Sequence, residues 1–170
     1  MPQSQPIPVP LDQHRETVQP EWIDYNGHMN VAYYVLAFDH ATDVWFEHLE
    51  LGEAYRQRTG CSLFALELHV LYSAELKEGD PLRITTHLLG FDDKRLHFFH
   101  RMYHAETGMP SACLEIMGLN VEMAARKAKP FPRVSLPRIE AVAAAHAALA
   151  RPPEAGRVIG LKRKSVGQPI

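Results

Sequence analysis

A carboxylate stands directly before a long amphipathic segment in this 170-residue chain. It is Asp24, in the run Trp22-Ile23-Asp24-Tyr25-Asn26-Gly27-His28-Met29-Asn30-Val31. A turn that leads into a helix places such a carboxylate beside the free backbone N–H groups of the first helical turn. The carboxylate can activate water or attack an acyl carbon, and the N–H groups can polarise the carbonyl under attack. The spacing therefore indicates both halves of an acyl-transfer site.

The elements around Asp24 follow from local residue types. Gly27 permits the left-handed backbone of a tight turn, and Asn30 is a favourable N-cap residue. From Val31 to Leu49 apolar residues recur at spacings of three and four, which predicts a helix with Gly52 as its stop. Within the turn itself, Asp24 is either a chemical group or an Asx-turn residue that only shapes the loop.

The rest of the chain predicts strands and turns. A first strand is expected over 14–21, and four more over 61–76, 82–89, 95–104 and 111–123. In 61–76 the even positions form an apolar face: Phe64, Leu66, Leu68, Val70, Tyr72 and Leu76. Short turns between the four strands predict an antiparallel meander with the helix on one face, an α+β fold. A short alanine-rich helix is expected over 139–150.

Composition limits the class of protein. A length of 170 residues and an apolar content of 46% predict a single globular domain. We divide the chain into an extended arm over 1–13, the domain over 14–135, and a C-terminal helix with a basic tail over 136–170. A net charge of −2 gives no field that favours nucleic acid. Cys61 and Cys113 are expected to be free thiols.

No segment reads as a signal peptide or a membrane anchor, because the proline-rich N-terminus lacks an apolar core and no run approaches ~20 apolar residues. A cytoplasmic protein with no membrane partner is the default expectation. The strand that carries His97, His100 and His104 offers no cysteine or carboxylate at ligand spacing, so no metal site is predicted.

The run Asp24-x-x-Gly27-His28-x-Asn30-x-x-x-Tyr34 resembles the signature of the 4-hydroxybenzoyl-CoA thioesterase family of hotdog acyl-CoA thioesterases. Tyr72, the turn at 78–80 and the Gly108 hairpin fall where that family has them, and the resemblance covers 14–131. It implies a hotdog fold, in which a curved antiparallel sheet wraps around a long central helix. It also implies an acyl-CoA substrate, no organic cofactor, and a homodimer or homotetramer.

Two further segments, Glu67-Leu68-His69 and Asp93-Lys94-Arg95-Leu96-His97, resemble the branch of the family linked to carnitine breakdown. Members of that branch hydrolyse betainyl-CoA, whose acyl group carries a trimethylammonium cation. Glu67 and His69 lie two apart on a strand and therefore share a face. One hypothesis is that Glu67 lines the acyl pocket and complements this cation. The alternative is a solvated or salt-bridged edge residue.

The resemblance also assigns roles at the turn. Asp24 is the expected catalytic carboxylate, either as nucleophile or as general base, and the sequence does not choose between them. His28 either contacts the thioester or holds the loop, and Asn30 fixes the loop around the carboxylate. The Gly27 turn and the backbone N–H near Val31 are the expected oxyanion region.

Other candidates lie outside the turn. Tyr25 and Tyr34 join Glu67 and His69 as predicted substrate-binding residues. Three basic residues are candidates for the CoA phosphates: Lys94, Arg95 and Arg126. Because another hotdog branch carries its carboxylate on the central helix, Asp39 and Asp43 are fallback sites.

Two other functions remain open at this point. A hotdog hydratase or dehydratase resembles an Asp-x-x-x-x-His pattern with a proline before the histidine. Asp24 and His28 are four apart with no proline between them, which disfavours that class. A protein that binds acyl-CoA without hydrolysing it would lack the carboxylate or carry an added regulatory domain.

Overall fold

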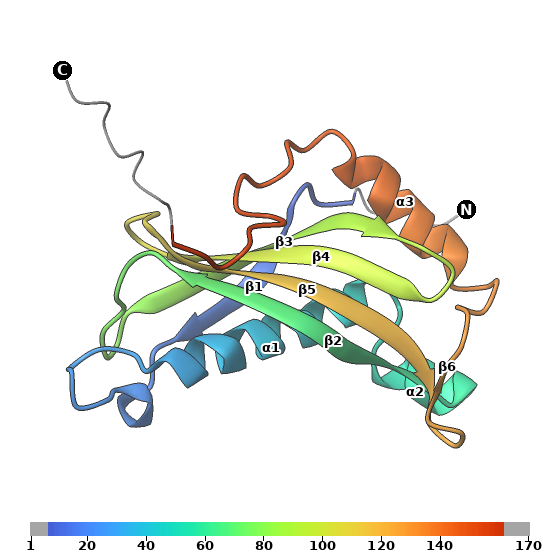
Figure 1. Ribbon diagram of the computed structural model, residues 1–170, viewed down its shortest axis with the longest axis horizontal. Coiled ribbons are helices and arrows are strands. Elements are labelled where there is room, and N and C mark those ends of the chain that lie inside the picture. The colour runs from blue at the N-terminus through green and yellow to red at the C-terminus, as the bar shows by residue number, and fades with distance from the viewer. Residues whose placement is uncertain (1–6, 162–170) are drawn as a thin grey trace, which may run out of the picture.

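The computed structural model describes residues 7–161 as one curved antiparallel sheet with helices (Figure 1). The first six residues of the predicted arm, and the basic tail from Lys162 on, lie outside the described residues. The strands are β1 (Leu11–Thr17), β2 (Cys61–Tyr72), β3 (Pro81–Phe91), β4 (Arg95–His104), β5 (Pro110–Glu122) and β6 (Lys127–Ala128). Their order is β1-β3-β4-β5-β2, and the short β6 pairs with β5.

The helices are a 3-10 turn η1 (Pro20–Trp22), α1 (Val31–His48), α2 (Glu53–Thr59) and α3 (Leu136–His146). The sheet curves over α1, whereas the C-terminal segment runs across the opposite face of the sheet (Figure 1). The inner face of β4 carries Leu96, Phe98 and Met102, and all three are buried. The Phe98 ring lies 6.0 Å from that of Trp45 on α1, so helix and sheet share one apolar core.

Buried histidines tie these layers together. His100 on β4 lies between Thr42 and Thr86, each of whose hydroxyl oxygens is 2.9 Å from a ring nitrogen. Complete burial lowers the pKa of His100 to about 3, so its ring is neutral. On α3, the His146 ring accepts the Leu88 N–H of β3 at 2.9 Å. Because β1 begins at Leu11, opposite Thr86, and does not reach Leu88, the His146 side chain satisfies a backbone donor that β1 leaves unpaired.

The predicted meander is correct for β3, β4 and β5 but wrong for β2. The turn over 77–80 does not fold β2 onto β3, since β2 pairs with β5 along its whole length, from Cys61 to Tyr72. The turn instead bonds to the end of β1, where Gly79 N–H donates to Val18 O at 3.0 Å and Val18 N–H to Asp80 O at 3.0 Å. The preceding residues pass the start of α1, where Met29 N–H donates to Leu76 O at 2.7 Å.

The single apolar face predicted for 61–76 is also wrong. A bulge between Ala65 and Glu67 shifts the register against β5. Before the bulge the odd position Leu63 faces α1, and after it the even positions Leu68 and Val70 do, because they pair with the inward Ile116 and Leu114. The strand ends at Tyr72.

Several element bounds differ from those expected. The first strand begins at Leu11, within the predicted arm, and ends before Pro20, which starts the 3-10 turn. The sequence did not predict α2 or β6. Gly52 precedes α2 as its N-cap position and does not end α1. The C-terminal helix starts at Leu136, because Pro137 fits a first helical turn. Cys61 and Cys113 are free and buried, as expected.

No helix within residues 7–161 is long and apolar enough to cross a membrane.

Candidate active site at the start of α1

The turn that carries Asp24 is closed by its own backbone. Asp24 N–H donates to His28 O at 3.1 Å, and Gly27 N–H donates to Asp24 O at 3.0 Å. Gly27 has a φ of 80°, the left-handed conformation expected of it. The Oδ1 atom of Asp24 accepts the N–H of Asn26 at 2.8 Å. The Asx-turn geometry considered from the sequence is therefore present, and it fixes the carboxylate.

Asn30 joins this carboxylate to the helix. Its Oδ1 accepts Ala32 N–H at 3.0 Å, which confirms the predicted N-cap. Its Nδ2 donates to Asp24 Oδ2 at 3.3 Å. Tyr33 N–H is bonded to the Asn30 carbonyl at 3.0 Å. Within the described residues Val31 N–H has no hydrogen-bond partner, so this donor at the positive end of α1 is available.

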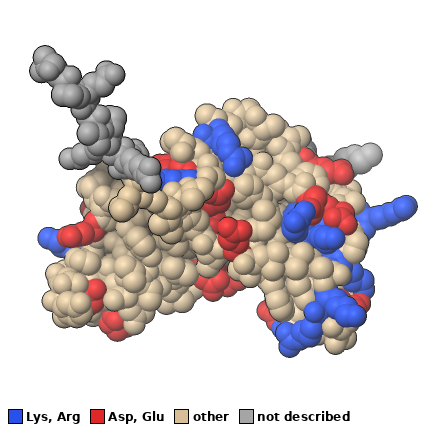
Figure 2. All heavy atoms as spheres, in the orientation of Figure 1, with Lys and Arg blue, Asp and Glu red and all other residues tan. Residues whose placement is uncertain are grey.

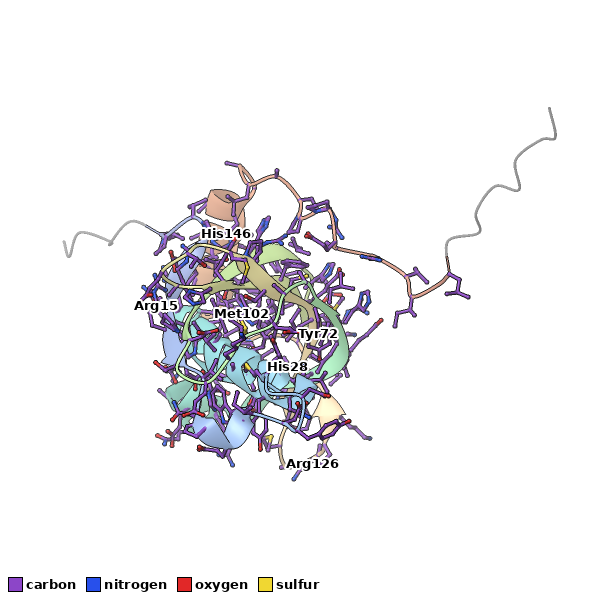
Figure 3. The ribbon with its side chains drawn as sticks, turned by 90° about the vertical axis from the view of Figure 1, so that its left-hand side faces the viewer. Arg15, His28, Tyr72, Met102, Arg126 and His146 are labelled. Atoms are coloured by element: carbon purple, nitrogen blue, oxygen red, sulfur yellow. The ribbon has the colours of Figure 1, made fainter. Side chains whose placement is uncertain are left out.

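A cavity of about 250 Å³ opens beside this helix start. Its lining comes from the turn, the first turn of α1, the last residue of β2 and the chain that follows β2: His28, Met29, Val31, Tyr34, Tyr72, Ser73, Ala74 and Glu75. Figure 3 shows His28 and Tyr72 together at this end of the molecule. Val31, the residue whose N–H is available, therefore lines this cavity.

Two tyrosines give the cavity a fixed aromatic wall. The Tyr34 and Tyr72 rings meet edge to face, with centroids 5.2 Å apart and an interplanar angle of 85°. Tyr72 OH donates to Val31 O at 3.2 Å, and Tyr34 OH donates to Ala74 O at 3.4 Å while accepting Leu76 N–H at 3.2 Å. Burial raises the pKa of both phenols, so they remain protonated at neutral pH.

The other ionisable groups that line the cavity are His28 and Glu75. His28 Nδ1 lies 3.2 Å from Met29 O, which favours a proton on Nδ1. Its Nε2 lies 3.9 Å from Glu75 Oε1. The Glu75 side chain is 70% exposed, so it can meet a ligand that enters the cavity.

Residues 18–145 match the model of the thioesterase-like superfamily. The chain belongs to this superfamily. The family expected from the sequence is thereby confirmed.

Three relatives are especially informative. The chain is 44% identical to a betainyl-CoA thioesterase of Pseudomonas aeruginosa over 89% of its own length and 95% of the relative. A candidate thioesterase of Pseudomonas putida has a similar structure, with 34% identity, a TM-score of 0.78, and coverage of 90% of this chain and 97% of the other. A Staphylococcus aureus protein solved in complex with CoA is 28% identical, with a TM-score of 0.81 and coverage of 89% and 98%.

In this thioesterase-like protein, two predicted substrate-binding residues lie on the other face of the sheet. Glu67 and His69 line a cavity of about 460 Å³ together with His97 and Glu115, over which the C-terminal segment 156–159 runs. Since the turn of Asp24 precedes α1 on the inner side, one chain does not bring these residues together with Asp24. Tyr25 is 96% exposed and lines none of these cavities.

The predicted phosphate contacts also lie apart from Asp24. Lys94 and Arg95 are at the turn between β3 and β4, and Arg126 is in the hairpin after β5, at the opposite end of the sheet from the start of α1. Basic side chains gather over that end, which also carries α2 (Figure 2). Arg95 is already paired with Asp92, whose carboxylate lies 2.6 Å away.

The fallback carboxylates lie farther along α1. Asp39 lines a small cavity between α1 and β2 with Phe46 and Leu68. Burial raises the pKa of Asp43, and the negative charge of Asp39 adds to this effect. Within residues 7–161 no group of three or more His, Cys, Asp or Glu side chains is arranged to hold a metal ion.

Glu75 and its neighbours Ser73 and Ala74 were missed as site residues by sequence reasoning. The strand predicted over 61–76 includes all three, whereas β2 ends at Tyr72 and the chain then turns past α1. The sequence feature that could have located this cavity is the pair of tyrosines. Tyr34 lies in the run that resembles the family signature, and Tyr72 lies where that family has a matching residue.

Proposed function

We propose that this protein hydrolyses betainyl-CoA to betaine and free CoA. The observation that carries the proposal is the arrangement of Asp24, Asn30 and the available Val31 N–H at the start of α1. The identity with a betainyl-CoA thioesterase over nearly its full length supports the choice of acyl group.

In this mechanism the thioester carbonyl oxygen accepts the Val31 N–H, where the positive end of α1 stabilises the developing negative charge. Asp24 acts on the carbonyl carbon, either by taking a proton from an attacking water or by direct attack. The C–S bond then breaks and CoA leaves as a thiolate. In the first route the thiolate takes up the proton that Asp24 took from water. In the second route a mixed anhydride with Asp24 remains, and a water molecule hydrolyses it, which releases betaine, restores the Asp24 carboxylate and supplies the proton of the CoA thiol. Asp24 can do this while bonded to Asn26 and Asn30, because a carboxylate has about four acceptor positions.

The remaining turn residues have supporting roles in the proposal. Gly27 gives the turn its left-handed step, and Asn30 aligns Asp24 with the helix end. His28 and Tyr34 line the cavity in which the acyl group is placed. Tyr25, Glu67 and His69 are not included, since none of them lines this cavity in one chain.

We further propose that the protein is a homodimer, paired through β2, within a hotdog fold whose central helix is α1. Among the described strands, β2 is an edge that pairs only with β5, and it exposes Leu66 and Leu68. Such an edge favours pairing with another strand. An 18-residue helix, about 27 Å at ~1.5 Å per residue, separates Asp24 from the basic end of the sheet. A twofold axis at β2 makes the two protomers run in opposite directions. The basic end of one protomer, with the partner's Lys94, the partner's Arg95 and the partner's Arg126, then lies toward the Asp24 turn of the other.

The activity is tested by thiol release from betainyl-, acetyl-, medium-chain and aromatic acyl-CoA, with wild type, Asp24→Asn, and Asp43→Asn as the matched carboxylate control. We expect wild type to prefer betainyl-CoA and Asp24→Asn to lose at least about a hundredfold in kcat, as for removal of a general base. Loss in Asp43→Asn with survival of Asp24→Asn would move the chemistry onto α1. No turnover of any substrate would favour an acyl-CoA-binding protein.

The dimer is tested by light scattering. We expect a mass about twice the 19.2 kDa of the chain. Leu66→Lys on the β2 edge should yield monomers, whereas Val134→Lys, at an exposed position outside the sheet, should not. A wild-type monomer would refute the pairing.

A further inference from the structure

We propose that Tyr34, Tyr72 and Glu75 form the pocket that recognises the quaternary ammonium of the acyl group and so determine substrate specificity. The inference rests on the proposed function and assigns its selectivity to residues other than Glu67. It starts from the 250 Å³ cavity beside the first turn of α1, which these three side chains line.

The position of the cavity fits the shape of the substrate. In a betainyl thioester the nitrogen is only two bonds from the carbonyl carbon. A group that binds this cation must therefore adjoin the atom that holds the carbonyl oxygen. Val31 supplies the available N–H, and its own carbonyl accepts the Tyr72 hydroxyl at 3.2 Å. The aromatic wall is thus attached to the residue proposed to bind the oxyanion.

The chemistry of the lining fits a cation that has no N–H. A trimethylammonium group offers no hydrogen-bond donor on nitrogen, so a protein can recognise it only through negative charge and aromatic faces. The cavity provides both, in Glu75 and in the Tyr34–Tyr72 pair. Among residues 7–161, no lysine or arginine lines it. The hydroxyls of both tyrosines are bonded to backbone carbonyls, which fixes the rings before a ligand arrives.

Glu75 is free to serve as the counter-charge. Within residues 7–161 its only ionic neighbour is His28, at 3.9 Å, and its side chain is 70% exposed. A substrate that covers this carboxylate excludes water from it and strengthens its attraction for the bound cation. Glu67 is not placed to do this, because it lies on the opposite face of the sheet.

The test compares kcat/KM for betainyl-CoA with that for 3,3-dimethylbutanoyl-CoA, in which carbon replaces the charged nitrogen and the shape is kept. The variants are Glu75→Gln, Tyr72→Leu and Tyr72→Phe. Glu78→Gln is the control, an exposed carboxylate three residues away that does not line the cavity. Melting temperatures establish that each variant is folded.

We expect Glu75→Gln and Tyr72→Leu each to lower kcat/KM for betainyl-CoA about tenfold, as for loss of a desolvated cation–π or charge contact. The neutral substrate should change less than about twofold in the same variants. Tyr72→Phe, which keeps the ring, should retain most of the preference for the cation, and Glu78→Gln should match wild type. Equal losses on both substrates, or no loss on either, would overturn the inference while leaving the thioesterase intact. If wild type hydrolyses neither substrate, the proposed function itself fails.

Discussion

Asn30 bonds both the start of α1 and the carboxylate of Asp24, and substitutions can separate these two contacts. Asn30→Ala removes the N-cap acceptor and the Nδ2 donor together. Asn30→Ser keeps a capping oxygen but is too short to hold Asp24. Asn30→Asp keeps the cap and places a second negative charge where Nδ2 now donates to Asp24 Oδ2 at 3.3 Å.

The magnitudes differ between stability and catalysis. Loss of an N-cap costs about 1 kcal/mol, which lowers Tm by about 2–4 °C in a protein of this size. Asn30→Ala should show this change, and Asn30→Ser should not. In Asn30→Asp, two unit charges 3.3 Å apart repel by about 1.3 kcal/mol at a water-like dielectric constant of ~80. This repulsion should move the acid limb of the kcat/KM profile upward by about one pH unit.

The assay is betainyl-CoA hydrolysis from pH 5 to 9, with Tm measured for each variant. All three variants should lose activity, because none donates a hydrogen bond to Asp24, while Asn30→Ser keeps a Tm near that of wild type and Asn30→Asp loses stability as the pH rises and both carboxylates ionise. Wild-type activity in Asn30→Ser would refute the claim that Asn30 positions the carboxylate. An Asn30→Asp enzyme that is active with an unshifted acid limb would show that Asp24 is not the group that titrates.

Three more predictions concern the scaffold. Burial lowers the pKa of His100 to about 3 and that of His48 to about 4. Between pH 6.5 and 4 both histidines bind protons mainly in the unfolded protein, so the free energy of unfolding should fall as the pH is lowered, by up to about 1.4 kcal/mol per pH unit per group. A free energy of unfolding in urea that stays constant between pH 6.5 and 4 would contradict this. Tyr55→Phe leaves the buried Asn120 Oδ1 without its 2.9 Å donor and should cost about 1–3 kcal/mol in the same assay; an unchanged midpoint would mean that water replaces the hydroxyl. Gly27→Ala should lower the free energy of unfolding by about 1–2 kcal/mol through the positive φ alone, since no atom lies within 4 Å of the added Cβ. Gly27→Asn should lower it less, and equal losses for the two variants would argue against backbone strain.

The parts of the fold that the sequence predicted well depend on local signals. The helix from Val31 was predicted because its apolar spacing and its Asn30 cap lie within one segment. Neighbouring strands joined by tight turns, such as β3, β4 and β5, were predicted for the same reason. The partner of β2 could not be predicted this way. The turn over 77–80 shows that the chain changes direction, but it does not determine which strand pairs with β2.

Short elements gave too little signal. The helix α2 has seven residues and buries only Tyr55, so no periodicity extends over it. Pro137 suggested a boundary before Ile139, yet a proline is tolerated within the first helical turn, and α3 begins one residue before it. The turn of Asp24 was the easier part, because Gly27 and Asn30 are the residue types that a left-handed step and a helix cap require.

The cation site shows how one extra residue changes a functional assignment. Strict alternation from Leu63 onward would put Glu67 and His69 on the face of α1, but the bulge after Ala65 inserts one residue and reverses the faces beyond it. Glu67 and His69 consequently face the outer side of the sheet, with Glu115 and His97. A carboxylate beside α1 must come from beyond the end of β2, where alternation no longer applies. Glu75 meets that condition because the chain passes the first turn of α1 before β3 begins, a connection that depends on the pairing of β2 with β5. In this proposal, specificity for the acyl group therefore depends on the order of the strands in the sheet and on the bulge in β2.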